Sequence, residues 1–141
     1  MNDHRVEARR WFLQAQADMA VVRTLVSAGH YATACFHAQQ AAEKALKALL
    51  FSQGERVVWG HSVRELARQC EGYDQTLATF TADTALLDQF YIPTRYPNGL
   101  PSPAVPSESY TVGQATAAQE ATERLLGAVE TFLRQRTRVL A

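Results

Sequence analysis

A row of polar side chains at helical spacing could line one side of a binding cleft. His37, Gln40, Lys44 and Lys47 follow steps of three, four and three residues, so a helix would present them on one face. Lysine ammonium groups in such a cleft would contact phosphate oxygens. The plainer alternative, which spacing alone favours, is that the three longer side chains face water and His37 lies at the edge of the core.

His61 stands directly before a helix-start pattern, Ser62 followed by Glu65 three residues later. A histidine at that point could reach across a cleft or donate a hydrogen bond to a backbone carbonyl. The alternative interpretation is a structural loop histidine, and the residue types do not decide between the two.

The segment Tyr91-Ile-Pro-Thr-Arg-Tyr-Pro97 combines a cation with aromatic rings. Arg95 could hold a phosphate through two parallel hydrogen bonds while a tyrosine ring stacks on a base. Alternatively, Arg95 pairs with an acid such as Asp88 or Glu43 and fixes the loop.

Two acids complete the set of residues that could carry chemistry. Asp18 borders the apolar stripe of its helix, and a partly buried carboxylate needs a partner. The pattern favours a salt bridge from Asp18 to Lys44 or Arg95 over a catalytic role. Glu43 precedes Lys47 by four residues, the favourable orientation for an ion pair on a helix.

Hydrophobic periodicity predicts the elements that position these residues. Apolar steps of three and four indicate helices over residues 4–28, 30–52, 62–72 and 111–138, and a further helix over 74–91 that is broken near 79–84. The fold class is therefore all-α. The Ala-rich face of 30–52 and the stripe of the last helix are candidates for core or for a dimer surface.

All five prolines fall within residues 93–109, which excludes a regular helix there. A loop of this length inside one small domain, residues 1–141, is typical of a mobile or partner-binding segment.

Composition excludes several classes of protein. No apolar run is long enough to span a membrane, and the N-terminus lacks the apolar core of a signal peptide. Two cysteines, Cys35 and Cys70, and four scattered histidines predict neither a disulfide framework nor a metal site. We therefore expect a cytoplasmic protein without a cofactor.

Net charge is zero, yet the charges are unevenly distributed. Residues 69–94 hold four acids and no lysine or arginine, whereas Arg134, Arg136 and Arg138 make the C-terminal end basic. No extended basic surface for a long nucleic acid is evident.

Three motifs together resemble the HEPN domain, named for nucleotide binding in higher eukaryotes and prokaryotes. They are the long segment Gly29–Leu50, His61-Ser-Val-x-x-Leu66 and the segment Tyr91–Pro97, in family order over residues 5–136. The resemblance implies an up-and-down bundle of about five helices that commonly forms a homodimer. It also implies a minimal nucleotidyltransferase as partner, in a pair that behaves as toxin and antitoxin.

Other HEPN proteins are metal-independent ribonucleases whose motif places a histidine five to seven residues after the arginine. Arg95 occupies the arginine position, but His61 is the last histidine of the chain. Without that histidine the motif lacks its proton-transfer group. This indicates a non-catalytic module.

The sequence thus predicts a HEPN module that binds a nucleotide, a nucleotidyltransferase partner, or both. The expected ligand-binding residues are His37, Gln40, Lys44, Lys47, His61, Arg95 and Tyr96, with Asp18 and Glu43 orienting the cations. The alternatives are a metal-independent ribonuclease toxin, with His61 in place of the missing histidine, and a purely structural dimerisation module.

Overall fold

Two long helices form the first hairpin of the computed structural model, which describes residues 3–140. Helix α1 (His4–Ala28) begins where the Asp3 carboxylate accepts a hydrogen bond from the Arg5 amide, and it ends at Gly29, whose φ is 84°. Helix α2 (Tyr31–Ser52) follows at once. Both helices match the sequence prediction to within one residue.

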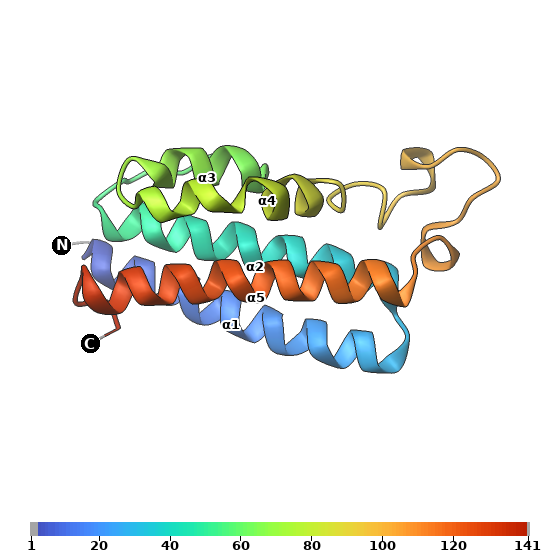
Figure 1. Cartoon of the computed structure of the whole chain (residues 1–141), viewed down its shortest axis with the longest axis horizontal. Coiled ribbons are helices and arrows are strands. Elements are labelled where there is room, and N and C mark those ends of the chain that lie inside the picture. Colours follow the sequence, from blue (N-terminus) through green and yellow to red (C-terminus); the bar gives the residue numbers. More distant parts are fainter. Residues whose placement is uncertain (1–2, 141) are drawn as a thin grey trace.

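Helix α2 is the centre of the bundle, with α1 on one side and α5 (Val112–Gln135) on the other (Figure 1). Its alanines are buried, and such small side chains let neighbouring helices approach closely. The Thr122 hydroxyl donates to the Ala38 carbonyl at 3.0 Å, a buried bond that fixes α5 along α2. Both faces that were candidates for a dimer surface therefore belong to the core.

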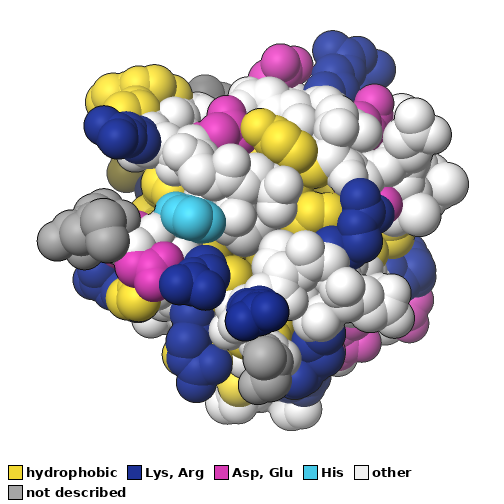
Figure 2. Space-filling view, turned by 90° about the vertical axis from the view of Figure 1, so that its left-hand side faces the viewer, with side chains coloured by type: hydrophobic (Ala, Val, Ile, Leu, Met, Phe, Trp, Pro, Cys, Tyr) yellow, Lys and Arg dark blue, Asp and Glu magenta, His cyan; other side chains and the backbone are white. Residues whose placement is uncertain are grey.

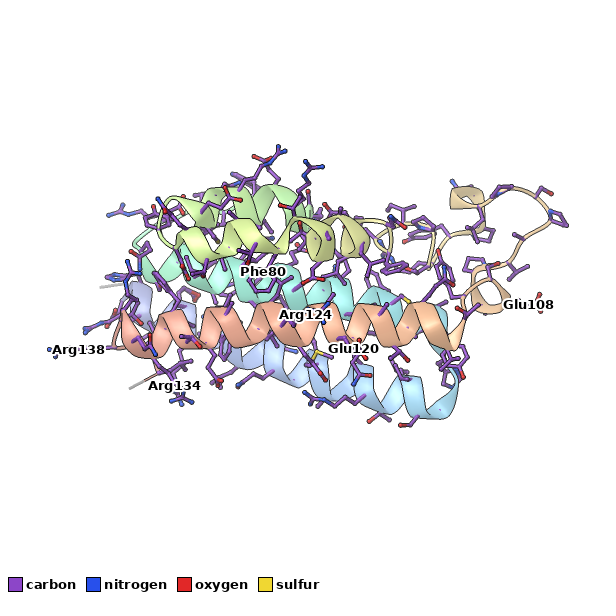
Figure 3. All side chains as sticks on the ribbon, in the orientation of Figure 1. Phe80, Glu108, Glu120, Arg124, Arg134 and Arg138 are labelled. Atoms are coloured by element: carbon purple, nitrogen blue, oxygen red, sulfur yellow. The ribbon has the colours of Figure 1, made fainter. Side chains whose placement is uncertain are left out.

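The sequence predicts a helix over 74–91 that is broken near 79–84, and the structure confirms the position of the break. Residues Gln75–Phe80 form a 3₁₀ helix, and α4 (Thr81–Asp88) continues from it. Helices α3 (Val63–Glu71) and α4 cover a further side of α2, and the 3₁₀ helix packs against α3. Arg124 extends from α5 to the Asp83 carboxylate, with nitrogen–oxygen distances of 2.8 and 3.1 Å, and this pair holds α4 against α5 (Figure 3).

The Pro-rich loop projects beyond one end of the bundle (Figure 1). It contains two single-turn 3₁₀ helices, Pro97–Gly99 and Pro106–Glu108, and no α-helix, as the prolines require. A Cβ atom on Gly99 would lie 3.0 Å from the Pro93 Cα, so the first turn folds back closely on the start of the loop. Pro106 is buried, and its turn packs against α2.

The chain leaves the loop through a complete capping box. The Thr111 side chain accepts from the Gln114 amide while the Gln114 side chain accepts from the Thr111 amide. The helix that follows ends at Gln135, three residues before the predicted end.

The basic C-terminal end is a solvent-exposed part of the surface. Arg134 and Arg138 lie at the end of the bundle opposite the Pro-rich loop (Figure 3). Lys and Arg side chains are spread over that end with acidic residues between them (Figure 2). Within residues 3–140, no helix is both long and apolar enough to cross a membrane.

The two cysteines supply a test of the packing of the helices. Both side chains are fully buried; burial raises the pKa of the Cys35 thiol to about 12, and it also raises that of Cys70, near Glu55 and Asp74. At pH 8 only roughly one Cys35 in ten thousand would be a reactive thiolate. We therefore expect no reaction of the folded protein with Ellman's reagent and two reactive thiols in guanidinium chloride. Stoichiometric labelling of the folded protein would contradict this packing.

Candidate functional site

The site is built around Glu43, a carboxylate of α2 that is only 5% exposed. Its Oε1 accepts from the Lys47 ammonium at 3.0 Å and lies 2.9 Å from His61 Nδ1. Its Oε2 accepts from the Gln40 amide at 3.1 Å. A buried carboxylate requires such partners, because leaving it unpaired costs several kcal/mol.

His61 is held so that one ring nitrogen remains available. Because a carboxylate only accepts hydrogen bonds, the contact with Glu43 assigns the hydrogen of a neutral His61 to Nδ1 and leaves the Nε2 lone pair free. The side chain is 60% exposed. The buried Gln39 amide of α2 donates to the His61 carbonyl at 2.8 Å and so fixes the backbone of His61 against α2.

Arg95 lies among three aromatic rings. Its guanidinium carbon is 4.2 Å from the ring centre of Phe36 and 4.9 Å from the ring centres of both Tyr91 and Tyr96. Its Nε donates to the Tyr91 carbonyl at 3.0 Å. These contacts hold the guanidinium in place while Arg95 remains exposed to solvent.

Tyr91 joins the histidine and the arginine into one surface. Its ring stacks on the His61 ring, with centres 4.8 Å apart and planes 16° from parallel, and it also faces Arg95. The fold thus brings His61 and Arg95 to the same aromatic ring, although they are 34 positions apart in the sequence. The sequence prediction grouped these two residues, and the structure gives them a shared neighbour.

The alternative in which Arg95 pairs with Asp88 or Glu43 is wrong. Asp88 accepts hydrogen bonds from the start of α3, and Glu43 is occupied by Lys47, Gln40 and His61. No carboxylate of residues 3–140 lies within ion-pair distance of Arg95. Its charge is therefore available to an external anion.

The lysines differ from Arg95 because both are already paired. Lys44 binds the Asp18 carboxylate at 2.5 Å, one of the two partners predicted for Asp18, and lies toward α1. Lys47 is nearly buried between Glu43 and the ring of Trp11, 5.6 Å from the ring centre. Asp18 and Glu43 thus orient the two lysines, and each carboxylate also neutralises the charge of the lysine that it binds.

Two predicted residues lie at the edge of this arrangement. His37 is half-buried, and its ring lies edge-to-face with that of Phe36, with ring centres 5.5 Å apart. Tyr96 is 49% exposed and offers one ring face to Arg95. Sequence reasoning missed Phe36 and Gln39, which carry no signal of their own. Only their positions on α2, close to Gln40 and Glu43, indicate that they belong to the site.

The arrangement combines a free guanidinium, a histidine nitrogen and exposed aromatic rings. It can bind an anion, accept one proton and stack against a flat ring. Within the described range 3–140, no three His, Cys, Asp or Glu side chains lie close enough together to hold a metal ion.

Comparisons with known proteins give consistent results. A family model described as the HEPN domain matches residues 8–135. Human sacsin is 30% identical over 93% of this chain, and the chain spans 3% of sacsin's length. The Methanocaldococcus jannaschii protein named "Putative toxin MJ1304" is 26% identical, with 92% of this chain and 90% of that protein covered.

Solved structures also have the same fold. TT1696 from Thermus thermophilus superposes with a TM-score of 0.82 at 36% identity, over 88% of this chain and 96% of that one. ST0689, described as an archaeal HEPN homologue, gives a TM-score of 0.72 at 34% identity, covering 88% of this chain and 95% of its own. The bundle of about five helices predicted from the sequence is confirmed.

Glu43 supplies the test of this site as a buried network. We expect Glu43→Ala to lower the free energy of unfolding by about 3–5 kcal/mol, because Lys47 would remain buried without its counter-charge. Urea denaturation measures the effect. Glu7→Ala, which breaks the surface pair with Arg10 at 2.6 Å, is the control and costs at most about 1 kcal/mol. Equal losses in the two variants would mean that Glu43 is not the centre of the network.

Proposed function

The chain belongs to the HEPN domain family, and on this premise we propose that it is a non-catalytic module that binds the phosphate of a nucleotide. The observation that carries the proposal is the Arg95 guanidinium, which is held by three rings and has no carboxylate partner within residues 3–140. A preorganised cation of this kind binds phosphate without first breaking an internal ion pair.

The neighbouring residues take subsidiary roles in this proposal. Tyr96 stacks on the base, and the Nε2 lone pair of His61 accepts a hydrogen bond from a ribose hydroxyl. Gln40 and Lys47 hold the Glu43 carboxylate that positions His61, Lys44 is neutralised by Asp18, and His37 bounds the site. Because Lys44 and Lys47 are paired, Arg95 makes the principal contact.

The same proposal includes a protein partner. A relative named as a toxin supports a toxin-like role, and we propose that the chain acts as a homodimer in a pair with a minimal nucleotidyltransferase. The exposed residues Ile92, Tyr96 and Val105, on and beside the projecting loop, provide apolar surface for such contacts.

One observation favours a second function, a metal-independent ribonuclease. Glu43 and His61 form a carboxylate–histidine pair whose free Nε2 could serve as a general base. In that reaction Nε2 would take the proton of a ribose 2′-hydroxyl, the 2′-oxygen would bond to phosphorus, and the 5′-oxygen would leave and take a proton from water. Arg95 would stabilise the charge on the phosphate.

Titration calorimetry with ATP, GTP and a short RNA tests the binding proposal. We expect Arg95→Ala to bind at least about tenfold more weakly than the wild type, because hydrogen bonds to a charged donor are each worth about 1.5–3 kcal/mol. Arg9→Ala, which removes an exposed arginine of α1, should bind as the wild type does. Equal heats for the wild type and Arg95→Ala would remove Arg95 from the site.

A cleavage assay in EDTA separates the two functions. We expect freshly purified protein at micromolar concentration to leave RNA intact, since the chain lacks the histidine that follows the arginine in the nuclease motif. RNA cleavage by the wild type that is lost in His61→Ala would replace the binding proposal with the ribonuclease.

A further inference from the structure

Asp88, at the last position of α4, binds the first turn of a different helix. Its Oδ1 accepts from the Val63 amide at 2.6 Å, and its Oδ2 accepts from the Ser62 hydroxyl at 2.8 Å and from the Arg64 amide at 3.1 Å. One carboxylate thus satisfies three donors at the start of α3, where backbone amides lack partners within their own helix.

The two segments joined by Asp88 are those that carry the site. His61 directly precedes Ser62, the first residue that Asp88 binds. On the other side, Tyr91 follows Asp88 by three residues, stacks on His61 and accepts the hydrogen bond from Arg95. The Asp88 carboxylate therefore links the segment that carries His61 to the segment that carries Tyr91 and Arg95.

Helix capping alone does not account for this contact. The first turn of α3 already has a local cap, since the Ser62 hydroxyl accepts from the Glu65 amide at 3.1 Å. Asp88 comes instead from a position 25 residues after Val63. A carboxylate placed across two elements fixes their separation, which a local cap cannot do.

We propose that Asp88 is a positioning residue of the anion site: it holds the His61 ring against Tyr91 and thereby keeps His61 and Arg95 at one fixed separation. This inference rests on the proposed function for its effect on ligand binding. Its structural part, the placement of His61 against Tyr91, stands on the hydrogen bonds alone. Asp88 acts through its neighbours and does not itself touch the ligand.

The experiment compares Asp88→Asn with Asp83→Asn. Both residues are aspartates of α4, but Asp83 binds Arg124 of α5 and makes no hydrogen bond to α3. Two quantities are measured for each full-length variant: the affinity for ADP, used as the probe, and the proton resonances of the His61 ring. The resonances are assigned with His61→Ala, and Tyr91→Leu shows their positions when the stacked ring is absent.

For Asp88→Asn we expect about tenfold weaker ADP binding and a movement of the His61 resonances toward those of Tyr91→Leu. For Asp83→Asn we expect both readouts to match the wild type, even where its melting temperature falls. Unmoved His61 resonances in a folded Asp88→Asn variant would overturn the inference. Equal changes in both aspartate variants would also overturn it, since they would indicate general loosening of α4.

The design distinguishes this inference from the proposed function. If the wild type does not bind ADP, nucleotide binding at Arg95 fails, and the His61 resonances alone decide the role of Asp88. If Asp88→Asn does not fold, Asp88→Glu retains the charge and lengthens the side chain by one methylene. The same two readouts then apply, with a displaced His61 ring as the supporting result and an unmoved one as the contrary result.

Discussion

The architecture of the site depends on one buried charge, the Glu43 carboxylate. The small alanine side chains of α2 allow the neighbouring helices to pack closely around it. This close packing also buries polar side chains of α2. A carboxylate in that position must be matched by donors. Lys47, Gln40 and His61 meet this requirement, and His61 can do so only if the segment before α3 lies along α2.

From that requirement a chain of contacts leads outward to the surface. His61, once fixed by Glu43, offers a flat ring on which Tyr91 stacks, and Tyr91 in turn helps to hold Arg95. The interior of the bundle thus determines the position of an exposed cation through contacts between successive side chains. The polar pairs of α2 and the aromatic rings beside them together hold Arg95 in place. A protein with zero net charge can therefore present a localised positive charge at its surface.

The fold was predictable from the sequence to a greater extent than the site was. Helical periodicity and end signals such as Asp3 and Thr111 act within a few residues, so they locate α1, α2 and α5 closely. The grouping of His61 with Arg95 also followed from the motifs. The partners of Asp88 and the contact of Arg95 with Phe36 did not, because they depend on how α2, α3 and α4 pack together, and no local pattern specifies which distant side chains meet.

The Pro-rich loop has a consequence that lies in the unfolded chain. A segment that projects from the bundle, with Pro106 packed on α2, gains little from burial. Each proline, however, restricts the backbone before folding begins, so fewer conformations are lost when the loop becomes ordered. Five prolines lie between α4 and α5. They reduce the number of backbone conformations that the unfolded chain can adopt in the segment that connects α4 to α5. Compared with other residues at these positions, the prolines therefore stabilise the native protein by lowering the conformational entropy of the unfolded chain.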